Sequence, residues 1–191
     1  MAITKTKDGK PLDYIHCFTG KKFRPLTPAV EEIDIRDIAH ALAMQSRFGG
    51  MTRTFYSVAE HSVRVSLICP AKDALWGLLH DASEAYLKDL PAPVKYGAAA
   101  AAYREAEAAL MAVIAVKFGL SASEPHSVKR ADLILVHTEG RDLFPSGAHI
   151  TWLDETQAQP RRLNPLATWQ AAEQWFLERY RVLDRRAKAA A

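Results

Sequence analysis

The stretch Ala74-Leu75-Trp76-Gly77-Leu78-Leu79-His80-Asp81-Ala82-Ser83-Glu84 passes directly from apolar residues to a histidine and two acids. The apolar run predicts a buried helix, and residues three and four apart on a helix share a face. Glu84 is therefore expected beneath His80 and Asp81, so that groups able to bind a metal or move a proton meet. The competing interpretation is a hydrogen-bonded polar patch. Burying an imidazole beside two carboxylates is costly unless a cation or a full bonding network offsets the cost.

Further helices are expected on both sides of this stretch. Asp34 precedes an apolar stripe and is expected to cap a helix. Ser57-Val58-Ala59-Glu60 fits the capping-box pattern that begins a helix, and Gly119 follows an alanine-rich stretch as a typical helix end. The chain is therefore predicted to be all-α, with a small N-terminal hairpin or loop near Phe18–Phe23. The expected helices begin at Asp34, at Ser57 and after Pro70, and then cover 97–118, Ser127 to about Leu143, and about 165–183.

Length and composition favour a globular protein. The 191 residues are expected to form a single domain, 1–191, with a core at about 30–145. A net charge of +3 suits an anionic small molecule and is too diffuse to indicate a DNA or RNA polymer. The two cysteines form no framework typical of secreted proteins, and no apolar run is long enough to span a membrane. We therefore expect a cytoplasmic location and no membrane partner.

Three predicted helices carry candidate metal ligands. His61 lies in the first turn of the helix begun by Ser57, where the helix dipole favours the neutral imidazole that a metal needs. By itself, His61 fits a core position equally well. Asp132 lies in the apolar run Ala131–Val136, so an inward-facing carboxylate implies a cation, whereas an outward-facing one is an ordinary surface residue.

Taken together, His61, His80, Asp81 and Asp132 supply two imidazoles and two carboxylates. This mixed set suits one divalent ion such as Mn, Co, Ni, Fe or Zn better than Ca or Mg, although Mg stays among the candidates. Such an ion polarises a phosphoryl oxygen and acidifies bound water, and Glu84 is placed to orient or deprotonate that water.

The order His…His-Asp…Asp resembles the HD superfamily of metal-dependent phosphohydrolases. Within it, the similarity is to bacterial 5′-deoxynucleotidases and to phage and prophage relatives that include deoxynucleoside triphosphate hydrolases. The similarity extends from about residue 18 to residue 183. The stretches that carry it are Ile33–Ala39, Arg47-Phe48-Gly49-Gly50, Phe55–Ser62, His80-Asp81-Ala82-Ser83-Glu84, Asp89-Leu90-Pro91-Ala92-Pro93-Val94-Lys95 and Val128-Lys129-Arg130-Ala131-Asp132.

The resemblance implies an HD-domain helical bundle around the metal and a role for each matched residue. Arg47 corresponds to the arginine that grips phosphate, and Phe48 to an aromatic residue against the sugar, where the monophosphatases commonly have tryptophan. Glu84 corresponds to the acid beside the attacking water, and Asp89 to a second acid near the sugar and the leaving oxygen. Lys95 and Lys129 match residues that reach phosphate in the triphosphate-cleaving relatives. The alternative for each cation is a solvated surface charge.

The favoured function is a phosphohydrolase acting on (deoxy)nucleotides, specifically a 5′-deoxynucleotidase that releases phosphate from deoxynucleoside 5′-monophosphates. One alternative is a deoxynucleoside triphosphate hydrolase, and another is a non-catalytic HD module that binds a nucleotide or a protein partner. A two-metal enzyme would need more histidines between Asp81 and Asp132, where His126 stands alone. Relatives of this kind are usually dimers or larger, so the resemblance also implies a homo-oligomer.

Overall fold

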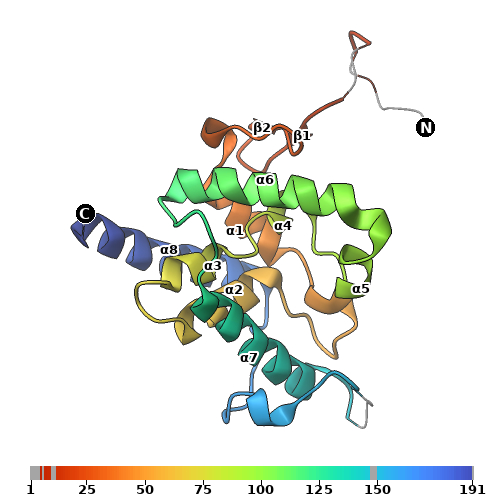
Figure 1. Cartoon of the computed structure of the whole chain (residues 1–191), viewed down its shortest axis with the longest axis vertical. Helices are drawn as coiled ribbons and strands as arrows, with labels where there is room; N and C mark the ends of the chain where they lie inside the picture. Colours follow the sequence, from red (N-terminus) through yellow and green to blue (C-terminus); the bar gives the residue numbers. More distant parts are fainter. Residues whose placement is uncertain (1–4, 6, 10–11, 147–149, 191) are drawn as a thin grey trace.

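The fold is all-helical apart from one small hairpin, as predicted (Figure 1). The computed structural model describes residues 5, 7–9, 12–146 and 150–190. Strands β1 (Ile15–His16) and β2 (Lys22–Phe23) pair antiparallel, with Ile15 opposite Phe23. Gly20 supplies the positive φ of 82° in the turn between them. The hairpin therefore begins slightly before the segment where it was expected.

The helices follow one another along the chain, and none in the described ranges is long and apolar enough to cross a membrane. Their bounds, with η marking 3₁₀ helices, are η1 Val30–Glu32, α1 Ile35–Ala43, η2 Arg47–Gly50, α2 Val58–Ile68, α3 Ala74–Leu79, α4 Glu84–Leu87, α5 Ala92–Lys95, η3 Ala98–Ala100, α6 Ala101–Phe118, α7 His126–Leu143, η4 Glu155–Gln157 and α8 Trp169–Ala190.

The three predicted helix caps are present. The Asp34 carboxylate accepts a hydrogen bond from the Arg36 amide at the start of α1. The Ser57 hydroxyl accepts one from the Glu60 amide at the start of α2. Gly119 ends α6 in the left-handed conformation, with φ of 64°. These local signals determine where the site-bearing helices begin.

Helix α2 lies at the centre of the packing and contacts α1, α3, α7 and α8. Apolar residues of these helices are fully buried against it, and Figure 1 shows α2 between α3 and α7. Because α2 is covered on several sides, its polar residues His61 and Glu60 are buried as well. The site is therefore built where α2 meets α3 and α7.

Several helix boundaries differ from those expected: α6 begins at Ala101 rather than at residue 97, and α8 extends to Ala190, past the expected end near residue 183. The predicted helix through His80 and Glu84 ends at Leu79, and α4 begins only at Glu84. The His80 Nδ1 atom bonds to the Gly77 carbonyl at 2.9 Å. The Ala82 and Glu84 amides then bond to carbonyls three positions earlier, which makes tight turns in place of a continuous α-helix. The final helix begins at Trp169 rather than near residue 165, because Thr168 accepts the Ala171 amide hydrogen bond there.

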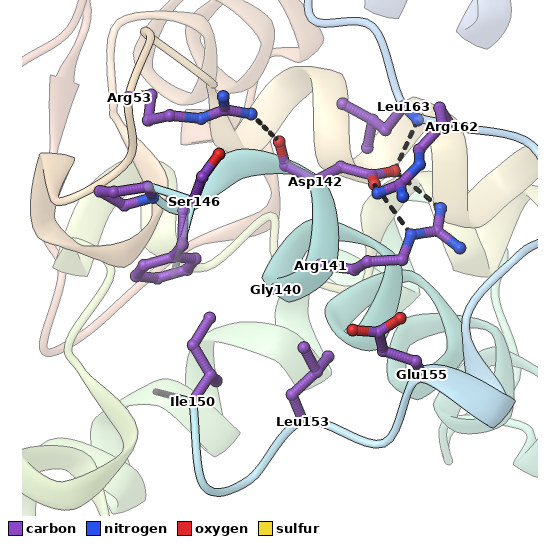
Figure 2. A pocket seen from close by; sticks show the side chains of 12 residues that line it. Arg53, Gly140, Arg141, Asp142, Ser146, Ile150, Leu153, Glu155, Arg162 and Leu163 are labelled. Atoms are coloured by element: carbon purple, nitrogen blue, oxygen red, sulfur yellow. Dashed lines mark hydrogen bonds and ion pairs between the residues drawn. The ribbon is translucent and has the colours of Figure 1, made fainter. Parts of the chain in front are cut away.

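The chain after α7 is tied to the end of that helix by Asp142 (Figure 2). The Asp142 carboxylate accepts hydrogen bonds from Arg141, from Arg162 and from the Leu163 amide, at 2.7–2.8 Å. Arg53 donates to the Asp142 carbonyl at 2.7 Å, and its amide donates to the Leu143 carbonyl at 2.9 Å. The loop that follows Arg47 and Phe48 is thereby held against α7.

Candidate metal centre

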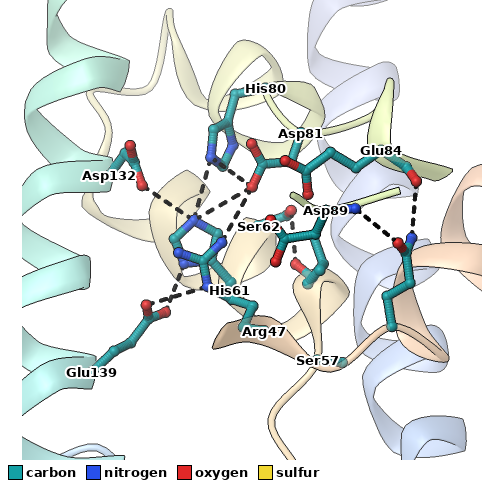
Figure 3. A network of polar contacts seen from close by, with 12 residues as sticks. Arg47, Ser57, His61, Ser62, His80, Asp81, Glu84, Asp89, Asp132 and Glu139 are labelled. Carbon is teal, nitrogen blue, oxygen red and sulfur yellow. Dashed lines mark hydrogen bonds and ion pairs between the residues drawn. The ribbon is translucent and has the colours of Figure 1, made fainter. Parts of the chain in front are cut away.

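Three of the predicted ligands form a compact cluster in which potential ligand atoms lie within 4.8 Å of one another. His61 comes from α2, and His80 and Asp81 come from the turn after α3 (Figure 3). The His61 Nε2 atom lies 3.3 Å from His80 Nε2 and 3.7 Å from Asp81 Oδ2. His80 Nε2 lies 3.2 Å from the same Asp81 oxygen. The cluster therefore has the geometry and residue types that can bind a metal ion.

Asp132 reaches this cluster from α7. Its Oδ1 atom lies 3.3 Å from His61 Nε2, and its side chain is only 19% exposed. The carboxylate therefore faces inward, which is the orientation that the sequence argument associates with a cation. All four predicted ligands meet around His61 Nε2, although Asp132 lies outside the tightest three-residue group.

The hydrogen bonds of the two imidazoles leave one nitrogen of each free for a metal. His61 Nδ1 lies 2.6 Å from Glu139 Oε1, and His80 Nδ1 lies 2.9 Å from the Gly77 carbonyl. Carboxylate and carbonyl oxygens accept hydrogen bonds, so each Nδ1 atom carries a proton, and in the neutral imidazole each Nε2 atom would present its lone pair to a metal ion. These Nε2 atoms face each other and the carboxylates, so the donor set fits a divalent ion.

The carboxylates around the two imidazoles favour the positively charged form of each ring. For His61, burial and Arg47 lower the pKa, but Glu139 and Asp132 outweigh them and raise it above its ordinary value. Burial lowers the pKa of His80 as well, whereas Asp81 and then Asp132 raise it to about 9. The prediction that the helix N-terminus lowers the proton affinity of His61 is therefore wrong, because the nearby carboxylates have the larger effect on its pKa.

Both aspartates have pKa values below their ordinary range. Burial raises the pKa of Asp81, but the charge and hydrogen bond of His80 lower it by more. Burial also raises the pKa of Asp132, and the hydrogen bond and charge of His61 together with the charge of His80 outweigh that effect. Both side chains are thus carboxylates at neutral pH, as metal ligands must be.

Glu139 is a buried residue of the site that the sequence reasoning missed. Its side chain is 0% exposed and contacts His61 Nδ1 through Oε1 and Arg47 Nε, at 3.3 Å, through Oε2. Burial raises its pKa, but Arg47 and His61 lower it below the ordinary value, so Glu139 is ionised. Its signal in the sequence is its spacing from Asp132, because seven residues are two helical turns and return to the same face.

The side chain of Arg47 points into the site (Figure 3). Its side chain is largely buried, and its Nη1 atom lies 3.5 Å from Asp81 Oδ2. The backbone turns sharply after Arg47, since Phe48, Gly49 and Gly50 all have positive φ. The guanidinium therefore lies between Asp81 and Glu139, where it can also bind an anionic ligand.

The two predicted catalytic acids lie close to the cluster. Glu84 is buried, and its Oε2 atom has no hydrogen-bond partner among the described residues. Burial, followed by the charges of Asp81 and Asp89, raises the pKa of Glu84 to about 9. Burial also raises the pKa of Asp89, while Arg47 opposes the rise. Burial thus favours the protonated form of both acids relative to the same groups in water.

Gln45 holds the segment that carries these acids and was not identified from the sequence. Its Nε2 atom donates to the Glu84 carbonyl at 3.0 Å, and its Oε1 atom accepts from the Asp89 amide at 3.1 Å. Lys88 lies between the two acids with a φ of 77°, a strained conformation for a residue with a side chain. One amide side chain therefore bridges both ends of a strained turn.

The remaining predicted contacts lie at the edges of the site. Lys95 Nζ is 2.7 Å from Glu107 and 3.8 Å from Glu84, so it lies beside one of the two predicted catalytic acids. Lys129 pairs with Asp132 at 3.4 Å, although its side chain is 67% exposed. The Phe48 ring centroid lies 5.3 Å from the Arg47 guanidinium carbon.

No family model matches the chain. It is 42% identical over 132 residues to the uncharacterised protein YfdR of Escherichia coli K12, and the match spans 69% of this chain and 73% of that protein. It is 39% identical over 122 residues to the uncharacterised protein RCAP_rcc00048 of Rhodobacter capsulatus, and that match spans 59% of this chain and 62% of the relative. It is 29% identical over 157 residues to the 5′-deoxynucleotidase PM0747 of Pasteurella multocida, where the match spans 64% of this chain and 78% of the relative.

Proposed function

The chain belongs to the same family as the Escherichia coli protein YfdR, and we propose that it is a metal-dependent nucleotide phosphohydrolase of the HD superfamily. The observation that carries the proposal is the meeting of two imidazoles and two carboxylates from separate segments around one point. The 29% identity with a protein named 5′-deoxynucleotidase supports nucleotides as the substrate class.

The proposed ligands of the ion are His61, His80, Asp81 and Asp132. One divalent ion, Mn, Co, Ni, Fe, Zn or Mg, would supply positive charge against a phosphate oxygen and lower the pKa of bound water. The residues around the cluster then bind and orient the substrate. Arg47 neutralises further phosphate charge, and Glu139 keeps the guanidinium and the His61 ring in place.

Glu84 and Asp89 are proposed to handle the protons. The free Glu84 Oε2 accepts a hydrogen bond from the attacking water and then its proton. Burial, followed by the charges of Asp81 and Asp89, raises the pKa of Glu84 to about 9, and positive charge in the cluster would favour its ionised, basic form. Asp89, whose pKa is raised, donates a proton to the departing oxygen. Electrostatic stabilisation of the phosphoryl group supplies most of the acceleration.

The favoured substrates are deoxynucleoside 5′-monophosphates, with Phe48 against the sugar and orthophosphate as the product. A deoxynucleoside triphosphate hydrolase is the second candidate, and it is favoured by the positions of Lys95 and Lys129. Lys95 faces Glu84 and Lys129 flanks Asp132, so both cations border the cluster where a longer phosphate chain would extend.

A panel of nucleotides assayed with Mn, Co and Mg, with products separated by chromatography, tests the proposal. Orthophosphate from monophosphates identifies the nucleotidase, whereas pyrophosphate or triphosphate identifies the second candidate. Asp81→Asn keeps the shape of a ligand and weakens it, so both turnover and metal content should be lost. Asp13→Asn, at an exposed carboxylate, serves as the control. Turnover by a metal-free preparation would reject the metal-dependent mechanism.

A further inference from the structure

Three aromatic side chains from separate segments gather beside Arg47. Phe48 belongs to η2, Phe144 follows α7, and Trp152 lies between α7 and η4. The Phe48 and Trp152 rings are parallel to within 13°, with centroids 6.4 Å apart. The Phe144 ring is nearly perpendicular to both, at 5.2 Å from Phe48 and 6.4 Å from Trp152. These three residues are called the aromatic cluster below.

The spacing in the aromatic cluster differs from that of two rings in direct contact. Phe18 and His40 are parallel to within the same 13°, but their centroids are only 3.9 Å apart. At 6.4 Å, the centroids of Phe48 and Trp152 lie in the range of offset aromatic pairs and lack the direct overlap of Phe18 and His40. The part of the cluster available to a further flat group is therefore the solvent-exposed surface of Trp152, with Phe144 packed nearby.

Trp152 is fixed on one side and exposed on the other. A Cβ atom added to Gly140 of α7 would lie 2.8 Å from Trp152 Cη2, so the indole packs directly on the helix backbone. Glycine inside a helix costs about 1 kcal/mol relative to alanine. Trp152 nevertheless keeps 47% of its surface exposed. Trp152 therefore packs on α7 with one part of its indole ring and exposes the rest to solvent.

The side chain of Arg47 lies between the aromatic cluster and the candidate metal centre. The Arg47 guanidinium carbon lies 5.3 Å from the Phe48 ring centroid, while its Nη1 atom lies 3.5 Å from Asp81. An anionic group held by Arg47 is thus close to both the metal centre and the aromatic rings. A nucleotide has this combination of a phosphate and a flat ring system.

We propose that Phe144 and Trp152 bind the base of the nucleotide, next to the sugar contact assigned to Phe48, and that Trp152 makes the enzyme prefer substrates that carry a base. This inference rests on the proposed function. Stacking on aromatic side chains tolerates every base, because each base has a π-face. The aromatic cluster therefore predicts a broad base range, together with strong selection against a sugar phosphate that lacks a base.

The test compares deoxyadenosine 5′-monophosphate with 2-deoxyribose 5-phosphate, by kcat/KM and by calorimetric binding affinity. In the unaltered protein the nucleotide should be preferred, and Trp152→Ala should reduce that preference by about 5- to 100-fold. Activity and affinity toward 2-deoxyribose 5-phosphate should stay unchanged. Trp152→Phe should retain most of the preference. Trp169→Ala, at a half-buried tryptophan beside His40, should leave it intact.

An equal loss toward both ligands in Trp152→Ala, or no preference in the unaltered protein, would overturn the proposal. Circular dichroism of each variant identifies a misfolded one, and Trp152→Phe then carries the test, since full loss of preference there also contradicts stacking. If the metal-loaded protein hydrolyses neither compound, the proposed function fails. The affinity ratio for the two ligands still decides whether the aromatic cluster binds the base.

Discussion

Replacing Glu139 with glutamine is expected to weaken metal binding without removing a metal ligand. Glu139 is 0% exposed, and its Oε1 atom lies 2.6 Å from the Nδ1 atom of His61. Glutamine keeps an oxygen that can accept the His61 hydrogen bond but lacks the negative charge. The change therefore isolates the electrostatic contribution of the carboxylate to the basicity of His61 Nε2.

The expected loss of metal affinity follows from the contact of Glu139 with the Nδ1 atom of His61, a proposed metal ligand. Removing a carboxylate that orients a metal-binding histidine typically costs about 10–100-fold in metal affinity. Glu139 also pairs with Arg47, at 3.3 Å, and breaking a buried ion pair costs about 3–5 kcal/mol of folding free energy. The variant should therefore bind metal more weakly and also unfold at a lower temperature.

Calorimetric titration of the metal-free protein with Mn²⁺ or Co²⁺, together with thermal unfolding, measures both effects. Glu60→Gln is the matched control, because Glu60 is buried on the same helix as His61 and pairs with Arg64 at 2.6 Å. It should lower the unfolding temperature and leave metal affinity unchanged. If Glu139→Gln binds metal as tightly as the unaltered protein, then Glu139 is a structural residue and the argument for its role fails.

Three further predictions concern the surrounding structure. Lys88→Gly should stabilise the protein by about 1 kcal/mol and raise Tm, since strain at such a φ costs more than the added chain freedom of glycine. An unchanged or lower Tm would contradict it. Gln45→Leu should lower kcat while leaving metal affinity intact, because it releases the Glu84 carbonyl and the Asp89 amide; a matching loss of metal affinity would count against this role. Burial raises the pKa of Asp142, but the hydrogen bonds from Arg141, the Leu163 amide and Arg162 together outweigh burial and lower it from 3.8 to about 2. The resulting stability is present above the unfolded pKa and is lost as pH falls toward 2. Denaturation at a series of pH values should show a steeper acid loss in the unaltered protein than in Asp142→Asn, and equal slopes would refute the assignment.

Much of the helical architecture was predictable because helix ends depend on neighbouring residues. Asp34 and Ser57 bond to amides two and three positions away, and Gly119 adopts a backbone angle that its own lack of a side chain permits. The break between α3 and α4 was missed. At this point the His80 ring bonds to the Gly77 carbonyl, a contact that hydrophobic spacing does not indicate.

For the candidate site, the residue types and their order indicated His61, His80, Asp81 and Asp132, together with the resemblance to a known superfamily. Their convergence required the tertiary structure. Glu139 stands 78 positions from His61, and Gln45 stands 39 positions from Glu84. No local pattern links such pairs. They meet because burying the apolar faces of α1, α2, α3, α4 and α7 also brings their polar side chains together, and a buried charge is stable only where it finds a partner.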